Sequence, residues 1–251
     1  MRHQRHRAPV LGAQIDATSW PQALALIAHW AQQRESRVVC FCNVHSVVTA
    51  GRDKVFSQTI QQADLALPDG APVAWLMRHT GHPEQARISG PDVMWRCLED
   101  AARCGCSVYF FGSTAATLEA LRQALAVQLP TLHVAGTESP PFRTFTESEN
   151  SAIAKRIQVS GAGLVFVGLG CPKQELWMDA QRGHIPAVML GVGAAFDFHA
   201  GRLQRAPSWM RDMGLEWLHR LLTEPRRLAG RYIHTNSVFI VGAIRQLFRR
   251  S

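Results

Sequence analysis

Short runs of apolar residues alternate along the chain with longer stretches in which apolar residues recur at helical spacing. Each run is too short for a helix and is bounded by polar, glycine or proline residues, as buried strands are. Strand–helix alternation of this kind favours an α/β fold, with a parallel sheet covered by helices on both faces. The predicted strands are Val38–Asn43, Asp64–Leu67, Ser107–Gly112, Leu132–Ala135, Leu164–Val167 and Ala187–Leu190.

Helical periodicity separates these strands. The first helical stretch follows Asn43 and continues to Ile60. The other predicted helices are Ala71–His79, Thr114–Leu129, Glu147–Val159 and Lys173–Arg182.

The pattern changes near Pro207, beyond which the chain has two tryptophans, repeated arginines and no strand-like run. We therefore predict a core at 1–206 and a helical appendage at 207–251. Within the appendage, Gly214, Pro225 and Gly230 are predicted to interrupt the helices.

Length and composition are those of an ordinary globular protein, with 251 residues of which 47% are hydrophobic and 18% charged. No apolar window reaches the roughly 20 residues of a membrane-spanning helix. The basic N-terminus lacks the apolar segment of a secretory signal. These features predict a cytoplasmic protein.

Positive charge is concentrated at the C-terminal end. Residues 202–251 hold ten arginines and three acidic residues, a net charge of +7, whereas the first 201 residues carry +1. Such a tail suits phosphate groups or an anionic surface. The uncharged segment Ser237–Ile244 is too short to span a bilayer. It either lies on an anionic membrane surface or packs against the core.

Polar residues and glycines follow the predicted strands at their carboxyl ends. In a parallel sheet these ends meet at one edge, where ligands bind. A single glycine can simply end a strand, but several glycine-bearing turns at one edge favour a ligand site. The residues concerned are Asn43, Asp69, Gly112, Gly168 and Gly191.

The segment Gly168–Glu175, with the sequence GLGCPKQE, leads from a predicted strand into a predicted helix. Its glycines allow close backbone approach, and the free N–H groups of a helix start favour phosphate. Lys173 can add positive charge, and Gln174 can hydrogen-bond a base or ribose. The segment matches neither a Walker loop nor the GxGxxG fingerprint, so alone it indicates a phosphate turn of unspecified kind.

Asp69 lies in the turn between Leu67 and Gly70. A carboxylate at a strand end can accept a proton from an attacking hydroxyl. It can equally cap a turn or a helix. The surrounding residues leave both alternatives open.

Several motifs, in one order from about residue 10 to residue 235, resemble the WecG/TagA/CpsF glycosyltransferase family, also called glycosyltransferase family 26. The resemblance implies a Rossmann-like α/β core with a helical C-terminal appendage. The motifs are Asn43-Val-His-Ser46, Pro68-Asp-Gly70, Arg87-Ile-Ser-Gly-Pro-Asp92, Gly168–Glu175, Gly191-Val-Gly-Ala-Ala-Phe-Asp197, Arg205-Ala-Pro-Ser-Trp209, Glu216-Trp-Leu-His-Arg220 and Glu224-Pro-Arg-Arg227.

The resemblance also implies an inverting, metal-independent transfer from a UDP-sugar to a sugar on undecaprenyl diphosphate, without any cofactor. Asp69 would be the catalytic base. The chain has no D-x-D triplet to hold a metal, so arginines and backbone N–H groups would neutralise the phosphates. The expected phosphate- and acceptor-binding residues are Arg87, Arg220, Arg226 and Arg227. The expected donor-binding residues are Asn43, Gly112, Gly168, Gly170, Lys173, Gln174, Glu175, Gly191 and Gly193.

Two positions bear on the donor sugar. Phe41 stands where many relatives have threonine, which leaves this chain without a hydroxyl there. The Asn43-Val-His-Ser46 motif is closer to exopolysaccharide members of the family, including a xanthan-type glucosyltransferase, and predicts a hexose or an N-acetylhexosamine-type sugar. Transfer of N-acetylmannosamine or its uronic acid, in teichoic-acid or common-antigen synthesis, is the alternative.

Two other classes of protein share some of these features. An NAD(P)-binding oxidoreductase has a parallel sheet but needs the GxGxxG turn, which is not evident here. A nucleic-acid-binding module would use the basic tail, but the tail lacks regularly interleaved aromatic residues. The expected partners are a UDP-sugar, a lipid-linked diphosphate saccharide and the inner face of the cell membrane, without nucleic acid. Self-association through the appendage stays open.

Overall fold

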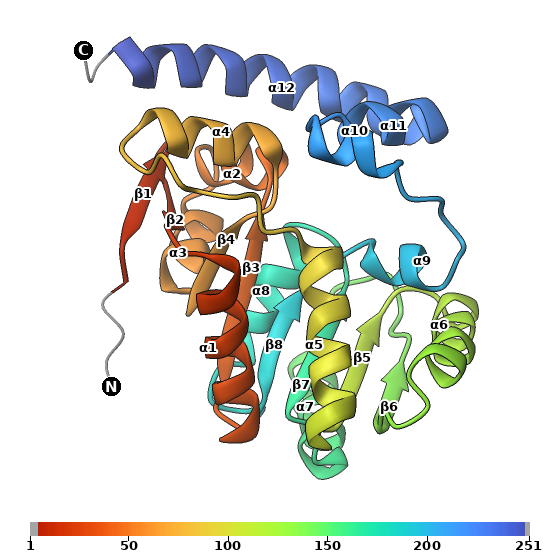
Figure 1. The fold of residues 1–251 in the computed structure, drawn as a ribbon. Helices are drawn as coiled ribbons and strands as arrows, with labels where there is room; N and C mark the ends of the chain where they lie inside the picture. Colours follow the sequence, from red (N-terminus) through yellow and green to blue (C-terminus); the bar gives the residue numbers. More distant parts are fainter. Residues whose placement is uncertain (1–4, 249–251) are drawn as a thin grey trace.

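The computed structural model describes residues 5–248, except for the side chains of Asp212, Arg227 and Arg231. Within that range, six parallel strands form one sheet in the order β4-β3-β8-β7-β5-β6 (Figure 1). This confirms the predicted α/β class. The strands are β3 Arg37–Cys42, β4 Leu65–Pro68, β5 Val108–Gly112, β6 Val134–Glu138, β7 Leu164–Gly168 and β8 Val188–Gly191.

Helices cover both faces of the sheet because its inner strands are apolar on both sides. Val39 and Phe41 of β3 face one buried cluster, whereas Cys40 of the same strand faces the other. The first face packs against α1 Trp20–Gln32, α5 Gly90–Cys104, α6 Ala115–Gln128 and α9 Ala195–His199. The second packs against α2 Val44–Ala50, α3 Lys54–Gln62, α4 Ala71–His79, α7 Glu147–Ser160 and α8 Lys173–Ala180.

The helical stretch predicted to run to Ile60 is two helices, and the prediction of one was wrong. Helix α2 ends at Ala50, and α3 begins after Asp53, whose carboxylate accepts hydrogen bonds from the N–H groups of Val55 and Phe56. An aspartate at this position stabilises a new helix start by satisfying its free donors.

Two strands and three helices, α1, α5 and α9, were not assigned from the sequence pattern. Strands β1 Arg7–Val10 and β2 Ala13–Asp16 form an antiparallel hairpin beside the main sheet. Helix α1 begins with a capping box between Ser19 and Gln22, and α5 ends at Gly105 in the left-handed conformation.

The appendage consists of α10 Ser208–Asp212, α11 Glu216–Thr223 and α12 Pro225–Phe248. Interruptions near Gly214 and Pro225 are confirmed, but the predicted break at Gly230 is wrong because α12 continues through it. A glycine inside a helix costs only about 1 kcal/mol, and packing of α12 on the core outweighs that cost. The domain boundary at residue 206 stays a prediction.

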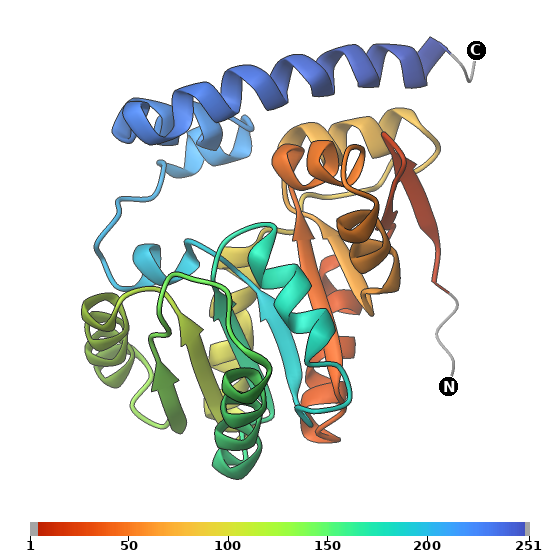
Figure 2. The ribbon, with the colours of Figure 1, turned by 180° about the vertical axis from the view of Figure 1, so that it is seen from behind.

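Helix α12 lies across α2 and reaches the N-terminal hairpin, as Figures 1 and 2 show from opposite sides. Phe239 and Ala243 are buried in this contact. At its far end, Gln246 donates to the carbonyl of Pro9 at 2.7 Å and accepts from the N–H of Leu11 at 2.8 Å. The two ends of the described chain are therefore bonded to each other. None of the described helices has the length and apolarity needed to cross a bilayer.

Candidate active site

The carboxyl ends of the strands bring together the predicted polar and glycine residues. Gly112 lies opposite Gly168 in the ladder of β5 and β7, and Val167 lies opposite Gly191 in that of β7 and β8. Across β3 and β4, Cys42 pairs with Pro68, so Asn43 and Asp69 follow at the same edge. The prediction that these residues gather at one edge is confirmed.

Asp69 is held at this edge by both its main chain and its side chain. Its N–H donates to the carbonyl of Cys42 at 3.1 Å. Its carboxylate accepts a hydrogen bond from the N–H of Gly90, the first residue of α5. Arg87 Nε donates to the main-chain oxygen of Asp69 at 2.6 Å, and Arg87 Nη2 lies 3.8 Å from its carboxylate. The N-cap of α4 is Gly70, and no side chain caps this helix. The alternative that Asp69 serves as a helix cap therefore does not apply.

Burial raises the pKa of Asp69 to about 6 despite the opposing charge of Arg87. The nearby negative charges of Glu216 and Asp92 raise the pKa further. The side chain keeps 19% of its surface exposed, so a ligand can reach it. A carboxylate that is ionised at neutral pH and is more basic than usual is suited to accept a proton from a hydroxyl group.

A chain of ion pairs connects Asp69 with the appendage. Arg87 pairs with Glu216 of α11, and Arg205 lies 3.5 Å from the same carboxylate. Arg205 also makes two hydrogen bonds to Asp92, at 2.5 and 2.7 Å. Burial acts against ionisation of Asp92, but the Arg205 guanidinium and the Ser89 hydroxyl lower its pKa to about 2.

Sequence analysis gave no role to Glu216, Arg205 or Asp92. All three lie inside the motifs on which the family resemblance rests, and this was the feature of the sequence that could have indicated a functional role for them. Their contacts span up to 129 positions along the chain, so no local pattern pairs them.

At three of the predicted donor-binding glycines an added Cβ would come within 3.0 Å of a neighbouring atom. A Cβ on Gly112, whose φ is +118°, would lie 2.6 Å from the carbonyl carbon of Gly168. A Cβ on Gly168 would lie 2.9 Å from the ring of Phe196, and one on Gly191 would lie 2.8 Å from Met178. These glycines allow the strand ends to approach closely.

Gly170 and Gly193 differ from those three because a Cβ there would make no close contact, so only their positive φ angles, +81° and +56°, require glycine. A Cβ at Gly170 would meet no atom within 4 Å. The turn at Gly170 is therefore the open part of the glycine-rich edge, where a ligand can approach the backbone.

Gln174 and Glu175 are buried beneath this turn. Gln174 Nε2 donates to the Gly191 carbonyl at 2.8 Å and to Glu175 at 2.9 Å, while its oxygen accepts from the N–H of Gly170 at 3.2 Å. The Gln174 amide thus braces the turn against β8 in this structure. Burial raises the pKa of Glu175 to about 7. Its Oε2 has no hydrogen-bond partner among the described atoms.

The other residues singled out from the sequence differ in how exposed their side chains are. Lys173 is exposed at the start of α8. The Asn43 side chain caps α2 by accepting from the N–H of Ser46 at 3.2 Å. Phe41 is buried, and its ring lies 3.4 Å from where a Cβ of Gly90 would be, so it fills the space beneath the start of α5.

The predicted phosphate-binding arginines are only partly brought together. Arg87 lies at Asp69, whereas the Arg220 guanidinium lies over the ring of Phe198 at 5.5 Å. Arg226 is exposed at the start of α12, and the side chain of Arg227 lies outside the described part of the structure. Nitrogens of three appendage side chains are buried without a hydrogen-bond partner among the described atoms: Arg211 Nε, His219 Nδ1 and Arg220 Nε.

Comparison with known proteins gives one family and a set of relatives. The model described as "Glycosyl transferase WecG/TagA/CpsF family" matches residues 8–251. Over 200 residues the chain is 29% identical to N-acetylglucosaminyldiphosphoundecaprenol N-acetyl-beta-D-mannosaminyltransferase of Bacillus subtilis (strain 168), covering 79% of this chain and 76% of the relative. A Bacillus spizizenii protein of the same name is 30% identical over 199 residues, with the same coverage.

The glycine contacts predict different costs for two alanine substitutions. Gly112→Ala forces a Cβ into the backbone of Gly168 and is expected to destabilise the fold by about 3 kcal/mol or more. Gly170→Ala incurs only backbone strain at positive φ, about 1 kcal/mol. Urea unfolding of both variants measures the difference. An equal or larger loss for Gly170→Ala would contradict the packing argument.

The shared arginine predicts the effect of Glu216→Gln on Asp69. Removing the negative charge of Glu216 leaves Arg87 to Asp69 alone, so the pKa of Asp69 should fall from about 6. Carboxyl-detected NMR titration of Asp69 measures this shift directly. Glu119→Gln, which removes an exposed charge on α6, is the control and should leave the Asp69 pKa in place. An unchanged or raised pKa in Glu216→Gln would show that the coupling is absent.

Proposed function

The chain belongs to the glycosyl transferase WecG/TagA/CpsF family, and we propose that this glycosyltransferase moves a sugar from a nucleotide-sugar donor to a saccharide on a lipid diphosphate. The observation that carries the proposal is Asp69, a basic carboxylate that is still accessible at the carboxyl edge of the sheet. The names of the two Bacillus relatives, which describe transfer to N-acetylglucosaminyldiphosphoundecaprenol, support the lipid diphosphate. The family assignment sets aside the oxidoreductase alternative.

The proposed donor is a UDP-sugar carrying a hexose or an N-acetylhexosamine. The names of the relatives favour an N-acetylhexosamine, and N-acetylmannosamine in particular. We propose that this transfer is a step in the synthesis of exopolysaccharide or another cell-surface polysaccharide. Hydrolysis measured across a panel of UDP-sugars distinguishes the donors.

In the proposed reaction, a hydroxyl of the acceptor attacks the anomeric carbon of the donor sugar. Asp69 takes the proton of that hydroxyl as the new carbon–oxygen bond forms. The bond between the anomeric carbon and the UDP oxygen breaks on the opposite side, which inverts the configuration. Arg87 holds the Asp69 turn through its 2.6 Å bond to the main-chain oxygen, so the base stays in place.

The leaving diphosphate and the acceptor diphosphate both need positive charge or hydrogen-bond donors. The turn at Gly170 and the start of α8 with Lys173 supply donors on the core side. On the appendage side, the unpartnered Nε–H groups of Arg211 and Arg220 are buried donors suited to phosphate oxygens, and His219 Nδ1 is a third buried nitrogen without a partner among the described atoms. The described residues contain no cluster of three His, Cys, Asp or Glu side chains that resembles a metal site. We assign phosphate binding to the donors named above on the basis of their own charge and hydrogen-bonding capacity.

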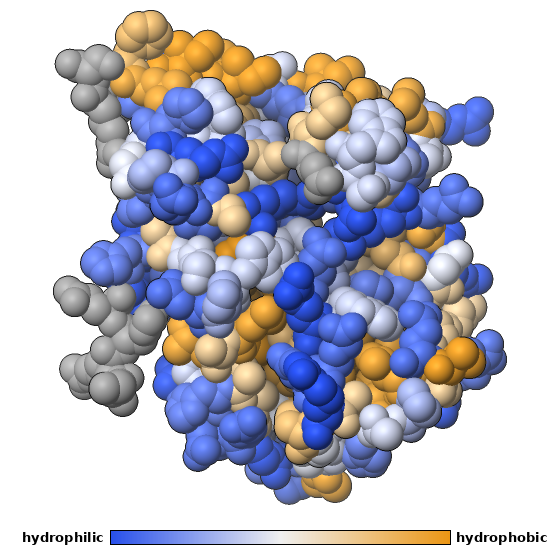
Figure 3. Space-filling model, viewed as in Figure 1, coloured by the Kyte–Doolittle hydropathy of each residue, from blue (hydrophilic) through white to orange (hydrophobic). Residues whose placement is uncertain are grey.

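The outer face of α12 is the proposed contact with the cytoplasmic face of the membrane. Figure 3 shows hydrophobic side chains gathered over this helix at the top of the molecule. The large exposed apolar residues of α12 are Ile233, Ile240, Val241, Ile244 and Phe248. Phe239 and Ala243 face the core instead, so the helix has two apolar faces, and the basic tail favours an anionic surface.

Asp69→Asn tests the assignment of the base. The amide cannot accept the proton, so transfer to a lipid-linked acceptor should fall by roughly 10²- to 10⁴-fold. UDP binding, measured by calorimetry, should be retained. Asp53→Asn is the matched control because asparagine caps a helix as well as aspartate does. Full turnover by Asp69→Asn would refute the assignment.

Substitution of the outer face of α12 tests membrane binding. The double variant Ile240→Asn, Ile244→Asn removes exposed apolar surface without touching the core contact, and should weaken binding by roughly tenfold or more. Sedimentation with phosphatidylcholine–phosphatidylglycerol vesicles measures binding. Val127→Asn, on the exposed side of α6, is the control. Equal binding by the double variant and the control would rule out this face as the contact.

A further inference from the structure

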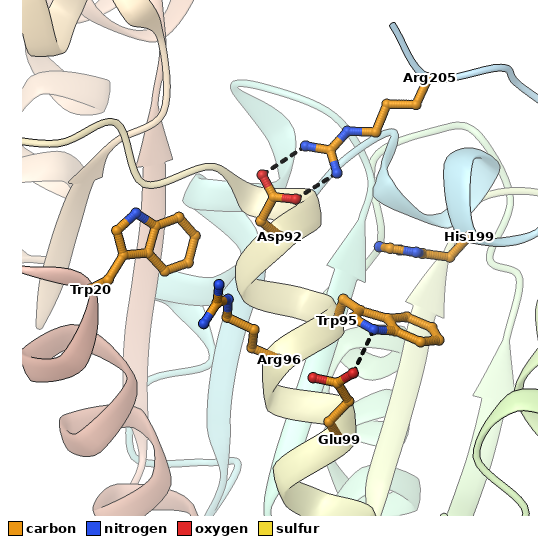
Figure 4. Close-up of a pocket in the computed structure, with 7 residues that line it drawn as sticks. All are labelled: Trp20, Asp92, Trp95, Arg96, Glu99, His199 and Arg205. Carbon is orange, nitrogen blue, oxygen red and sulfur yellow. Dashed lines mark hydrogen bonds and ion pairs between the residues drawn. The ribbon is translucent and has the colours of Figure 1, made fainter. Parts of the chain in front are cut away.

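A hollow of about 730 Å³ runs along the outer face of α5, outside the residues assigned to the reaction. Figure 4 shows Trp20 on one side of it, His199 on the other and Arg205 at its upper end. Four lining residues recur at helical spacing, so they form one stripe about 10 Å long. They are Asp92, Trp95, Arg96 and Glu99.

The aromatic rings of this hollow are fixed by the protein. Trp95 Nε1 donates to Glu99 at 2.8 Å, and the Trp95 ring stacks on His199 with centroids 5.3 Å apart. His199 is in turn bonded to the Pro91 carbonyl at 2.9 Å, and burial lowers its pKa, which favours a neutral ring at pH 7. On the opposite side, the Arg96 guanidinium lies over the Trp20 ring at 5.2 Å. Rings fixed in this way provide a binding surface that needs no reordering.

The charges of the hollow balance. Arg96 and Arg205 are opposed by Asp92 and Glu99, and Arg205 and Asp92 already neutralise each other. An anionic ligand would meet as many carboxylates as guanidinium groups, and an apolar ligand would have to desolvate four charges. A neutral sugar fits better, because its C–H face can contact an indole while its hydroxyls bond the exposed Arg96 and Glu99.

The hollow is connected to the candidate active site by direct contacts. Trp20 Nε1 donates to the main-chain oxygen of Arg87 at 2.9 Å. Asp92 lies in the first turn of α5, and the N–H of Gly90 at the start of that helix is bonded to Asp69. A ligand in the hollow would therefore lie beside the segment that positions the proposed base.

We propose that this hollow is a subsite for an uncharged saccharide unit of the acceptor, formed by Trp20, Trp95, Arg96 and Glu99. The assignment to the acceptor rests on the proposed transferase function. The binding of a neutral sugar does not rest on that function, because we infer it from the aromatic rings and the charge balance of the hollow alone.

Indole NMR on the full-length protein tests the subsite. Titration with cellobiose or N,N′-diacetylchitobiose, without donor, should shift the Nε1–H signals of Trp20 and Trp95 in a saturable way. Trp75, exposed on α4 away from the hollow, should not shift. Assignment uses single Trp→Phe variants.

Two variants sharpen the test. Trp95→Ala and the exposed Arg96→Ala should each weaken disaccharide binding by roughly tenfold, equivalent to about 1.4 kcal/mol, whereas Trp75→Ala should not. Arg96→Ala removes no buried group, so it remains informative if Trp95→Ala does not fold. Binding that neither variant weakens would overturn the assignment of the hollow.

Three outcomes of the titration would also overturn the proposal. The first is no saturable shift of Trp20 or Trp95 with either disaccharide up to about 20 mM, well above a millimolar dissociation constant. The second is an equal shift of Trp75, which indicates non-specific contact. The third is tighter binding of a uronic-acid disaccharide, which contradicts the uncharged ligand. The titration needs no turnover, so its result is independent of a separate transfer assay. Disaccharide binding by an enzyme that the transfer assay finds inactive would refute only the transferase function. Transfer by an enzyme whose hollow binds no disaccharide would refute only the subsite.

Discussion

One guanidinium, that of Arg87, is bonded to both the core and the appendage. It holds the main chain of Asp69, lies near the Asp69 carboxylate and pairs with Glu216 of α11. A partly buried charge of this kind is stable only while its partners are present, and removing one of them leaves an uncompensated charge. The position of the appendage and the basicity of Asp69 are therefore not independent properties of the molecule.

The requirement that partly buried charges keep their partners also applies to the residues around the site. Arg205 joins Glu216 to Asp92, and Trp20 bonds the main chain of Arg87, so the hollow along α5, Asp69 and α11 share one network. On the other side of the edge, the brace formed by Gln174 holds the glycine turn against β8 by hydrogen bonds alone. One half of the edge is ordered by ion pairs and the other by hydrogen bonds of the neutral Gln174 amide.

The sequence predicted those parts of the fold that depend on local pattern. Strands such as β7 were recognisable because burial on both faces makes them continuously apolar, and their carboxyl ends then located Asp69 and Gly170. The break between α2 and α3 was missed because the Asp53 cap lies in a stretch that is helical on both sides. The role of Glu216 was not predictable, since it exists only when residues 129 positions apart meet. Glu216 lies within one of the family motifs, but the motif does not show which residues its carboxylate contacts.

The dependence of Asp69 on α11 also sets an order of events during synthesis. The sheet is complete once β8 has been made, at Gly191, whereas Glu216 follows later, and Gln246, which fastens α12 to the first strand, follows later still. Domains fold largely in the order in which they leave the ribosome. The sheet that carries Asp69 is thus made before Glu216, one of the groups that raise the Asp69 pKa. The contacts of Gln246 then join a late segment of the chain to residues that were made early.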